Sequence, residues 1–135
     1  MRIAVDTNVL IRYLTWDDEE QAIEAADAIE GADAIVVPPI VLCELGWVLK
    51  RAYQYAGPEI IDILRRFVAI RAIDIERPAA QAGIAMLARD GDFADGVVRH
   101  EADRTRCDRI VTFDEGFARL LGPDKVALLG TRSTP

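Results

Sequence analysis

Two aspartates stand directly after short stretches that read as strands of a sheet. Asp6 follows residues 2–5, and Asp114 follows residues 109–112 with one aromatic residue between. In an open parallel α/β sheet, ligands bind in the crevice beyond the carboxyl ends of the strands. Carboxylates at that position are suited to holding a cation. Each aspartate also precedes a predicted helix, so capping of the free N–H groups of that helix is the alternative interpretation.

A third acid lies inside a very apolar helix. Glu44 is the only charged side chain between Val36 and Leu49, and the predicted helix runs from Pro39 to about Tyr53. We therefore expect Glu44 to be surrounded by apolar side chains. A buried carboxylate without a partner costs several kcal/mol or takes up a proton. Glu44 is thus expected either to bind a metal ion or to pair with an arginine that the sequence does not identify.

Two further aspartates stand at the start of another predicted helix. Asp92 and Asp95 are three residues apart, which places them on one helical face. Asp92 follows Gly91 and is a good candidate for the N-cap of that helix. Because one cap suffices for one helix, Asp95 is the stronger candidate for a functional acid, and the choice between the two stays open.

The elements that must position these acids alternate regularly. Strands are predicted near residues 2–5, 34–37, 72–75, 109–112 and 126–129, with helices between them. This alternation predicts an α/β protein with a parallel sheet and helices on both of its faces. Right-handed crossovers keep successive strand ends on one edge of such a sheet. The four acids Asp6, Glu44, Asp95 and Asp114 are therefore expected to converge at that edge.

Four carboxylates in one pocket need a counter-charge. Their mutual repulsion would otherwise raise some of their pKa values and cost stability. All-oxygen ligation suits a hard divalent cation such as Mg²⁺ or Mn²⁺ better than zinc. The sequence therefore predicts a magnesium-like ion held by Asp6, Glu44, Asp95 and Asp114.

Composition restricts the class of protein. The net charge of −7 argues against a protein that holds nucleic acid mainly through a basic surface, although a bound cation can supply positive charge to a phosphate. No apolar run approaches the roughly 20 residues that cross a bilayer, and no signal-peptide pattern opens the sequence. We expect a cytoplasmic protein without membrane contact, whose two cysteines are free thiols. At 135 residues it should form one domain over residues 1–130 with a flexible tail at 131–135.

The ordered set of motifs resembles the PIN-domain ribonucleases, and within them the VapC-type toxins of bacterial toxin–antitoxin pairs. The resemblance runs from Arg2 to about Leu129. Its carriers are Val-Asp-Thr-Asn-Val-Leu at residues 5–10, Pro-Pro-Ile-Val-Leu-Cys-Glu-Leu at 38–45, Asp-Phe-Ala-Asp at 92–95 and Val-Thr-Phe-Asp at 111–114. It implies a PIN-like three-layer fold with a five-stranded, mainly parallel sheet.

The same resemblance implies a function and roles for residues. The protein would be a Mg²⁺- or Mn²⁺-dependent ribonuclease, a homodimer and a toxin inhibited by a small antitoxin protein. Asp6, Glu44, Asp95 and Asp114 would be both the catalytic and the metal-binding acids. The expected supporting residues are Asn8, Thr112 and Asp92, and the candidate substrate-binding residues are Arg12, Arg99 and His100. For His100, a solvated surface position is the alternative, since a lone surface histidine is more often solvated than catalytic.

Two other classes of function compete with this one. A phosphoryl-transfer or phosphatase domain also places acids at strand ends, and Lys125 is a possible phosphate partner for it. However, Asp6-Thr7-Asn8 lacks a second aspartate two residues on. The other competitor is an inactive PIN-like domain that acts only by binding, against which the presence of four acids argues.

Overall fold

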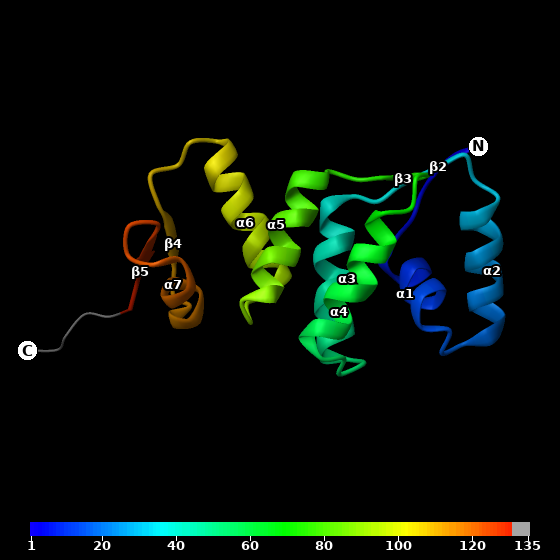
Figure 1. Cartoon of the computed structure of the whole chain (residues 1–135), viewed down its shortest axis with the longest axis horizontal. Helices are drawn as coiled ribbons and strands as arrows, with labels where there is room; N and C mark the ends of the chain where they lie inside the picture. Colours follow the sequence, from blue (N-terminus) through cyan, green and yellow to red (C-terminus); the bar gives the residue numbers. More distant parts are fainter. Residues whose placement is uncertain (131–135) are drawn as a thin grey trace, which may run out of the picture.

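The computed structural model describes residues 1–130 of the chain, and the tail expected at 131–135 lies outside the described residues. Five short strands alternate with seven helices in this part (Figure 1). In chain order the elements are β1 Arg2–Ala4, α1 Thr7–Thr15, α2 Glu19–Glu30, β2 Ala34–Val36, α3 Pro39–Arg51, α4 Gly57–Val68, β3 Ile73–Asp74, α5 Arg77–Ala88, α6 Phe93–Arg104, β4 Ile110–Thr112, α7 Glu115–Leu121 and β5 Val126–Leu128.

The α/β fold class is confirmed, and all strand pairs are parallel. The strands nevertheless form two sheets rather than the single sheet of five that we expected. One sheet has the order β1-β2-β3, and the other consists of β4 and β5. Figure 1 shows that the β4–β5 sheet lies on one side of α5 and α6, whereas the three-stranded sheet lies on the other.

Local sequence signals account for the starts of most helices. Asp6, Asp18 and Asp114 each accept a hydrogen bond from a backbone N–H in the first turn of the helix that follows. This arrangement satisfies donors that no intrahelical carbonyl can reach. Helices α3, α4 and α5 have proline in the first turn instead, where a missing N–H costs nothing.

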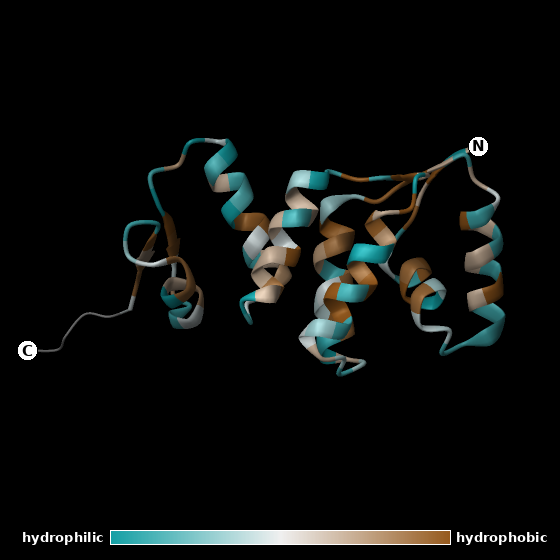
Figure 2. Ribbon diagram, viewed as in Figure 1, coloured by the Kyte–Doolittle hydropathy of each residue, from teal (hydrophilic) through white to brown (hydrophobic). Residues whose placement is uncertain are grey.

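The main core lies between the three-stranded sheet and the helices α1, α3, α4 and α5. Its most completely buried large side chains include Leu10, Ile35, Leu45, Leu64 and Phe67. The strands and the inner helix faces are accordingly apolar, while much of α2 and the end of α6 are polar (Figure 2). Burial of this apolar surface is the main force that holds these elements together.

Helices α5 and α6 pack unusually closely because of two glycines. A Cβ atom at Gly96 would lie 2.2 Å from the carbonyl oxygen of Ala82, and one at Gly83 would lie 2.5 Å from the ring of Phe93. Phe93 is 3% exposed and also packs over Gly46 of α3. These contacts fix the start of α6, which carries Asp95, against α5 and α3.

The first strand lies at the edge of its sheet and is not buried. Arg2 and Ala4 are exposed and Ile3 is partly buried, because β1 is an edge strand paired only with β2. Strand β4 is likewise an edge strand, and its Val111 is 61% exposed. Both strands therefore carry an unpaired edge within residues 1–130.

Candidate active site

Asp6 and Glu44 are linked by Thr7, which follows Asp6 in the chain and contacts Glu44. Thr7, at the start of α1, donates its hydroxyl to Oε2 of Glu44 over 2.8 Å. Oδ1 of Asp6 accepts a hydrogen bond from the backbone N–H of Val9 at 3.1 Å, so Asp6 caps α1. The capping role predicted as the alternative is therefore present, and it leaves Oδ2 of Asp6 free of any hydrogen bond found among residues 1–130.

The setting predicted for Glu44 is wrong. Its side chain is exposed rather than surrounded by apolar groups. Its neighbours Val41, Leu42 and Leu45 are buried, so the apolar composition of the helix overstated the burial of Glu44 itself. No salt bridge to Glu44 occurs in the described part of the chain, so the alternative of an arginine partner is not met, and the hydroxyl of Thr7 contacts the carboxylate instead.

The other acids line a separate hollow of about 470 Å³, which we call the acidic hollow. Asp92, Asp95 and Asp114 all border it. Partial burial and the negative charges of Asp92 and Asp114 together raise the pKa of Asp95 above its usual value. The structure thus brings Asp95, from the first turn of α6, near Asp114, which follows the next element, β4.

Backbone geometry explains how Asp114 is held. Its Oδ1 accepts from the backbone N–H of Phe117 at 2.9 Å, and its own backbone N–H donates to the hydroxyl of Thr112 at 3.0 Å. Thr112 therefore contacts the residue that it was expected to support. Asp114, like Asp6, caps a helix and keeps one carboxylate oxygen without a hydrogen bond inside residues 1–130.

Asp92 occupies the N-cap position of α6 but makes no capping hydrogen bond with its side chain. Its carboxylate instead forms a salt bridge of 3.2 Å with Lys50, from the last turn of α3. The N-cap prediction for Asp92 is thus confirmed in position but not in the expected hydrogen bond. Lys50 partly neutralises the acidic hollow beside Asp95.

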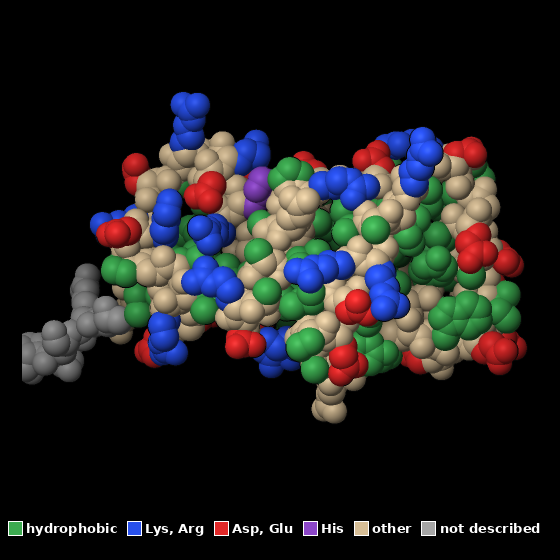
Figure 3. Space-filling view, in the orientation of Figure 1, with side chains coloured by type: hydrophobic (Ala, Val, Ile, Leu, Met, Phe, Trp, Pro, Cys, Tyr) green, Lys and Arg blue, Asp and Glu red, His purple; other side chains and the backbone are tan. Residues whose placement is uncertain are grey.

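Sequence reasoning missed the basic residues of the acidic hollow. Its border contains four basic side chains, Lys50, Arg51, Arg89 and Arg119, besides the predicted acids and Asp90. They come from the ends of α3, α5 and α7, so no spacing in the sequence identifies them as one group. The only signal in the sequence for this group was the presence of basic residues near helix ends. Such residues are also favoured there by the helix dipole, so they do not by themselves indicate a site. Figure 3 shows Lys and Arg side chains spread over the part of the surface that contains α5, α6 and α7.

The residues expected to bind substrate lie elsewhere. Arg12 is held by Asp17, Gln21 and Tyr53 in a network around the ends of α1 and α2. Arg99 and His100 border a different hollow of about 240 Å³ between α5 and α6. Asn8 lies beside α2, away from the acidic hollow. Neither Asn8 nor Arg12 borders that hollow.

The single chain does not fit the predicted metal site. No three His, Cys, Asp or Glu side chains within residues 1–130 stand close enough together to hold a metal ion. Asp6 follows β1 and Asp114 follows β4, and these strands belong to different sheets. The expected convergence of four acids at one sheet edge therefore does not occur within one copy of the chain.

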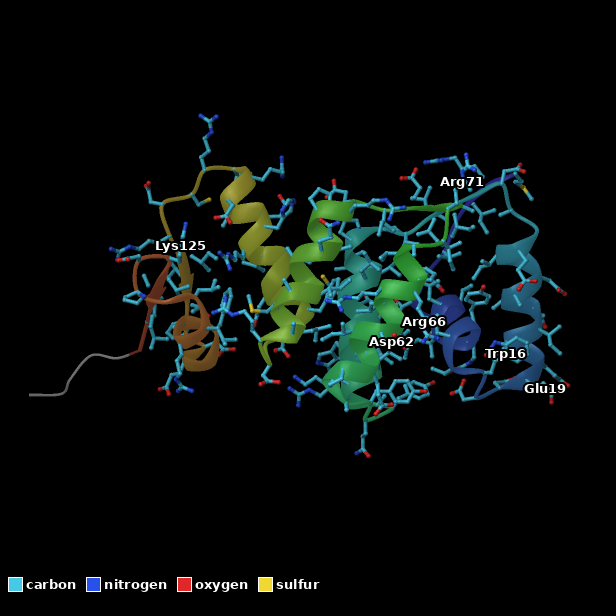
Figure 4. The ribbon with its side chains drawn as sticks, viewed as in Figure 1. Trp16, Glu19, Asp62, Arg66, Arg71 and Lys125 are labelled. Atoms are coloured by element: carbon cyan, nitrogen blue, oxygen red, sulfur yellow. The ribbon has the colours of Figure 1, made fainter. Side chains whose placement is uncertain are left out.

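The position of Lys125 weighs against the phosphatase alternative. Lys125 lies in the turn before β5, at the opposite end of the molecule from Trp16, which closes α1 (Figure 4). Asp6 is at the other terminus of α1, inside the same half of the molecule as the three-stranded sheet. In one chain, Lys125 is thus not placed to hold a phosphate against Asp6.

Comparison with known proteins identifies the family. A family profile for the PIN domain matches residues 3–122, which is most of the chain. The chain therefore belongs to the PIN-domain family, whose fold is generally that of a nuclease. No curated protein matches the chain closely enough to narrow this further. None of the helices among residues 1–130 has the length and apolar character needed to span a membrane.

Proposed function

We propose that this protein is a divalent-metal-dependent ribonuclease and the toxin of a type II toxin–antitoxin system. Membership of the PIN-domain family carries the nuclease part of the proposal. The toxin role follows the closer resemblance of the four motifs to VapC-type proteins. RNA would be the substrate, Mg²⁺ or Mn²⁺ the cofactor, a small antitoxin the protein partner, and the cytoplasm the place of action.

The main structural support is the charge pattern of the acidic hollow. Asp95 is partly buried beside two other carboxylates, which is an unfavourable arrangement unless a cation compensates it. Lys50, Arg51, Arg89 and Arg119 surround the same acids. These basic side chains would hold the phosphates of an RNA strand beside the carboxylates, despite the negative charge of the whole chain.

The reaction in this proposal is hydrolysis of a phosphodiester bond. A water oxygen adds to phosphorus and the bond to the 3′ oxygen breaks, so that the products carry a 5′-phosphate and a 3′-hydroxyl. A divalent ion supplies positive charge for this chemistry when it is bound. The carboxylates of Asp6, Glu44, Asp95 and Asp114 would hold it, with Thr112 fixing the backbone at Asp114. Within residues 1–130 of one copy these four acids are not gathered into a single group.

The decisive experiment measures cleavage of a mixed RNA pool with Mn²⁺ and with a chelator. We expect cleavage by the intact protein only when Mn²⁺ is present, and loss of cleavage in Asp6→Asn and Asp95→Asn. Asp62→Asn is a matched control, because Asp62 is exposed on α4 and pairs with Arg66 at 3.2 Å (Figure 4). Asp62 does not border the acidic hollow. This variant should cleave as well as the intact protein.

The outcomes separate the competing functions. Equal cleavage by all variants, or with chelator, would refute the assignment of these acids. Hydrolysis of a chromogenic phosphomonoester without RNA cleavage would favour a phosphatase. Expression in bacteria should arrest growth, and Asp95→Asn should relieve the arrest. Loss of cleavage with Asp92→Asn but not with Asp95→Asn would show that Asp92, rather than Asp95, is the acid from α6 that the reaction needs.

A further inference from the structure

Strand β1 has one edge without a partner strand. The backbone N–H of Val5 donates to the carbonyl of Val36, and the carbonyl of Met1 accepts from Asp33. Because hydrogen-bonding groups alternate along a strand, residues 1, 3 and 5 face β2. The N–H and C=O groups of Arg2 and Ala4 therefore face outward. No other strand of the described chain pairs with this edge.

Strand β4 has a matching unpaired edge. The N–H of Ile110 donates to Lys125, and the carbonyl of Thr112 accepts from Leu129, so these two residues face β5. The backbone groups of Val111 consequently face outward. Val111 is 61% exposed and Phe113 is 74% exposed, which is unusual for apolar side chains in and next to a strand. Exposed, apolar strand edges are templates for pairing with another strand.

The two open edges do not meet within one chain. The unit formed by β4, α7 and β5, which we call the C-terminal unit, lies across α5 and α6 from β1 (Figure 1). It is held there by the guanidinium of Arg89, which donates to the carbonyl of Leu120, and by Phe117, which is 5% exposed. The side chain of Leu120 also packs closely over Gly91. The open edges of β1 and β4 thus lie on opposite sides of α5 and α6 in one chain (Figure 1).

We propose that β4 of a second copy of this chain pairs in parallel with β1, and that the exchange is reciprocal. Each strand has three residues, and each is followed by one apolar residue and a capping aspartate. Each copy offers one edge of each kind, so a two-fold dimer satisfies both pairs and closes. The result is two five-stranded sheets, each of the order β3-β2-β1 followed by β4 and β5 of the other copy.

The hydrogen-bonding pattern fixes the register of this pairing. The outward groups of Val111 must bond to Arg2 and Ala4 of the other copy, which places Val111 opposite Ile3. Counting along both strands then sets Thr112 opposite Ala4 and Asp114 opposite Asp6. Adjacent strands lie about 4.8 Å apart, so the two aspartates become neighbours.

This pairing would complete the group of acids that one chain leaves divided. Asp6 and Glu44 of one copy would lie beside Asp114 of the other, which brings Asp95 with it from the acidic hollow. Each dimer would contain two such composite groups. Only this last consequence rests on the proposed function, because the strand pairing itself depends on backbone edges and not on catalysis.

A disulfide between the paired strands tests the arrangement without any enzyme assay. The chain with Cys43→Ala and Cys107→Ala, which removes both free thiols, would carry Ala4→Cys and Thr112→Cys. Directly opposed residues of adjacent strands have the spacing that a disulfide needs. We expect a disulfide-linked dimer on a non-reducing gel. The control pair Ala4→Cys and Asp124→Cys should not form it, since Asp124 is exposed in the turn before β5.

The possible results are distinct. A disulfide within one chain would show that β4 folds back onto its own β1, and the proposal would be overturned. Absence of both disulfides, or equal dimer formation by the control pair, would also overturn it. The same holds if light scattering finds the unmodified protein to be a monomer at every concentration, or if it finds open-ended chains rather than a closed dimer.

A second pair of variants addresses the edge directly. Val111→Pro removes the outward N–H of β4 without touching the bonds of Ile110 and Thr112 to β5. Each dimer loses two strand-pairing hydrogen bonds, so we expect its dissociation constant to rise by about tenfold to a hundredfold. Val111→Thr keeps the N–H and the β-branched shape and should remain a dimer. Equal dimerisation by both variants would contradict the pairing.

Failure of this proposal and failure of the proposed function are distinguishable. A cross-linked dimer that binds Mn²⁺ but does not cleave RNA would retain the pairing and remove the nuclease assignment. A monomer that cleaves RNA would retain the nuclease assignment and remove the strand pairing. Calorimetric titration with Mn²⁺ supplies a readout besides activity. We expect uptake by the intact dimer and loss of uptake by Val111→Pro at concentrations at which this variant is a monomer.

Discussion

The close contact between α5 and α6 leads to a quantitative prediction at Gly96. A methyl group there would lie 2.2 Å from the carbonyl oxygen of Ala82 and 2.8 Å from Cα of Gly83. Both atoms belong to the backbone of α5, so no change of side-chain rotamer can relieve the contact. Inserting Gly96→Ala must therefore push the two helices apart.

The size of the effect follows from two opposing contributions. Overpacking of a close contact costs roughly 1–3 kcal/mol, and the backbone partner places this case near the upper end. Replacing glycine by alanine inside a helix returns up to about 1 kcal/mol. We expect a net loss of about 2 kcal/mol in the free energy of unfolding, which corresponds to a fall in Tm of roughly 5–10 °C for a chain of this size.

Urea unfolding and thermal melts followed by circular dichroism measure this loss. Gly57→Ala is the matched control, because no heavy atom lies within 4 Å of a Cβ at Gly57. That variant should be neutral or more stable by up to about 1 kcal/mol. If Gly96→Ala unfolds within about 0.5 kcal/mol of the unmodified protein, the inferred close packing of α5 and α6 is refuted.

Three further predictions concern charged groups. The pKa of Asp95 is raised in the folded protein, so its ionisation destabilises the fold as pH rises above the ordinary value of about 3.9. Asp95→Asn should therefore increase Tm at pH 7 but not at pH 3. An equal change in Tm at both pH values would contradict this. The hydrogen bond from Tyr53 lowers the pKa of Asp17, so its stabilising contribution is present above the ordinary pKa and is lost as pH falls through the lowered one. Tyr53→Phe should move the pKa of Asp17 upward in an NMR titration, and an unchanged value would show that the hydroxyl is not its main partner. Asp6→Ala should cost about 1 kcal/mol of stability through loss of the cap of α1, whereas Asp6→Asn keeps the cap and should melt near the unmodified protein.

These variants also determine how activity tests must be designed. Asp6 and Asp114 each cap a helix with one carboxylate oxygen. Alanine at either position would remove a cap and a candidate ligand together. Asparagine retains an oxygen that accepts the hydrogen bond but loses the negative charge. A loss of function in the asparagine variants therefore reports on charge rather than on folding.

The sequence by itself determined the local elements and their order. Strands and helices differ in the spacing at which apolar residues recur, so neighbouring residues alone indicate which element forms. Capping aspartates and prolines mark where the helices begin. These signals correctly predicted an α/β chain with parallel strands and placed acids at the ends of β1 and β4. The placement of Thr112 beside Asp114 was expected only from the resemblance to PIN-domain proteins.

Only the tertiary structure decided which elements meet. The exposure of Glu44 depends on what covers α3, and the basic border of the acidic hollow depends on three helix ends coming together. The division of five strands into two sheets depends on where the C-terminal unit packs, which side-chain periodicity does not encode. A strand pattern specifies that an edge can pair but not which strand it pairs with, because backbone hydrogen bonds are the same for every residue.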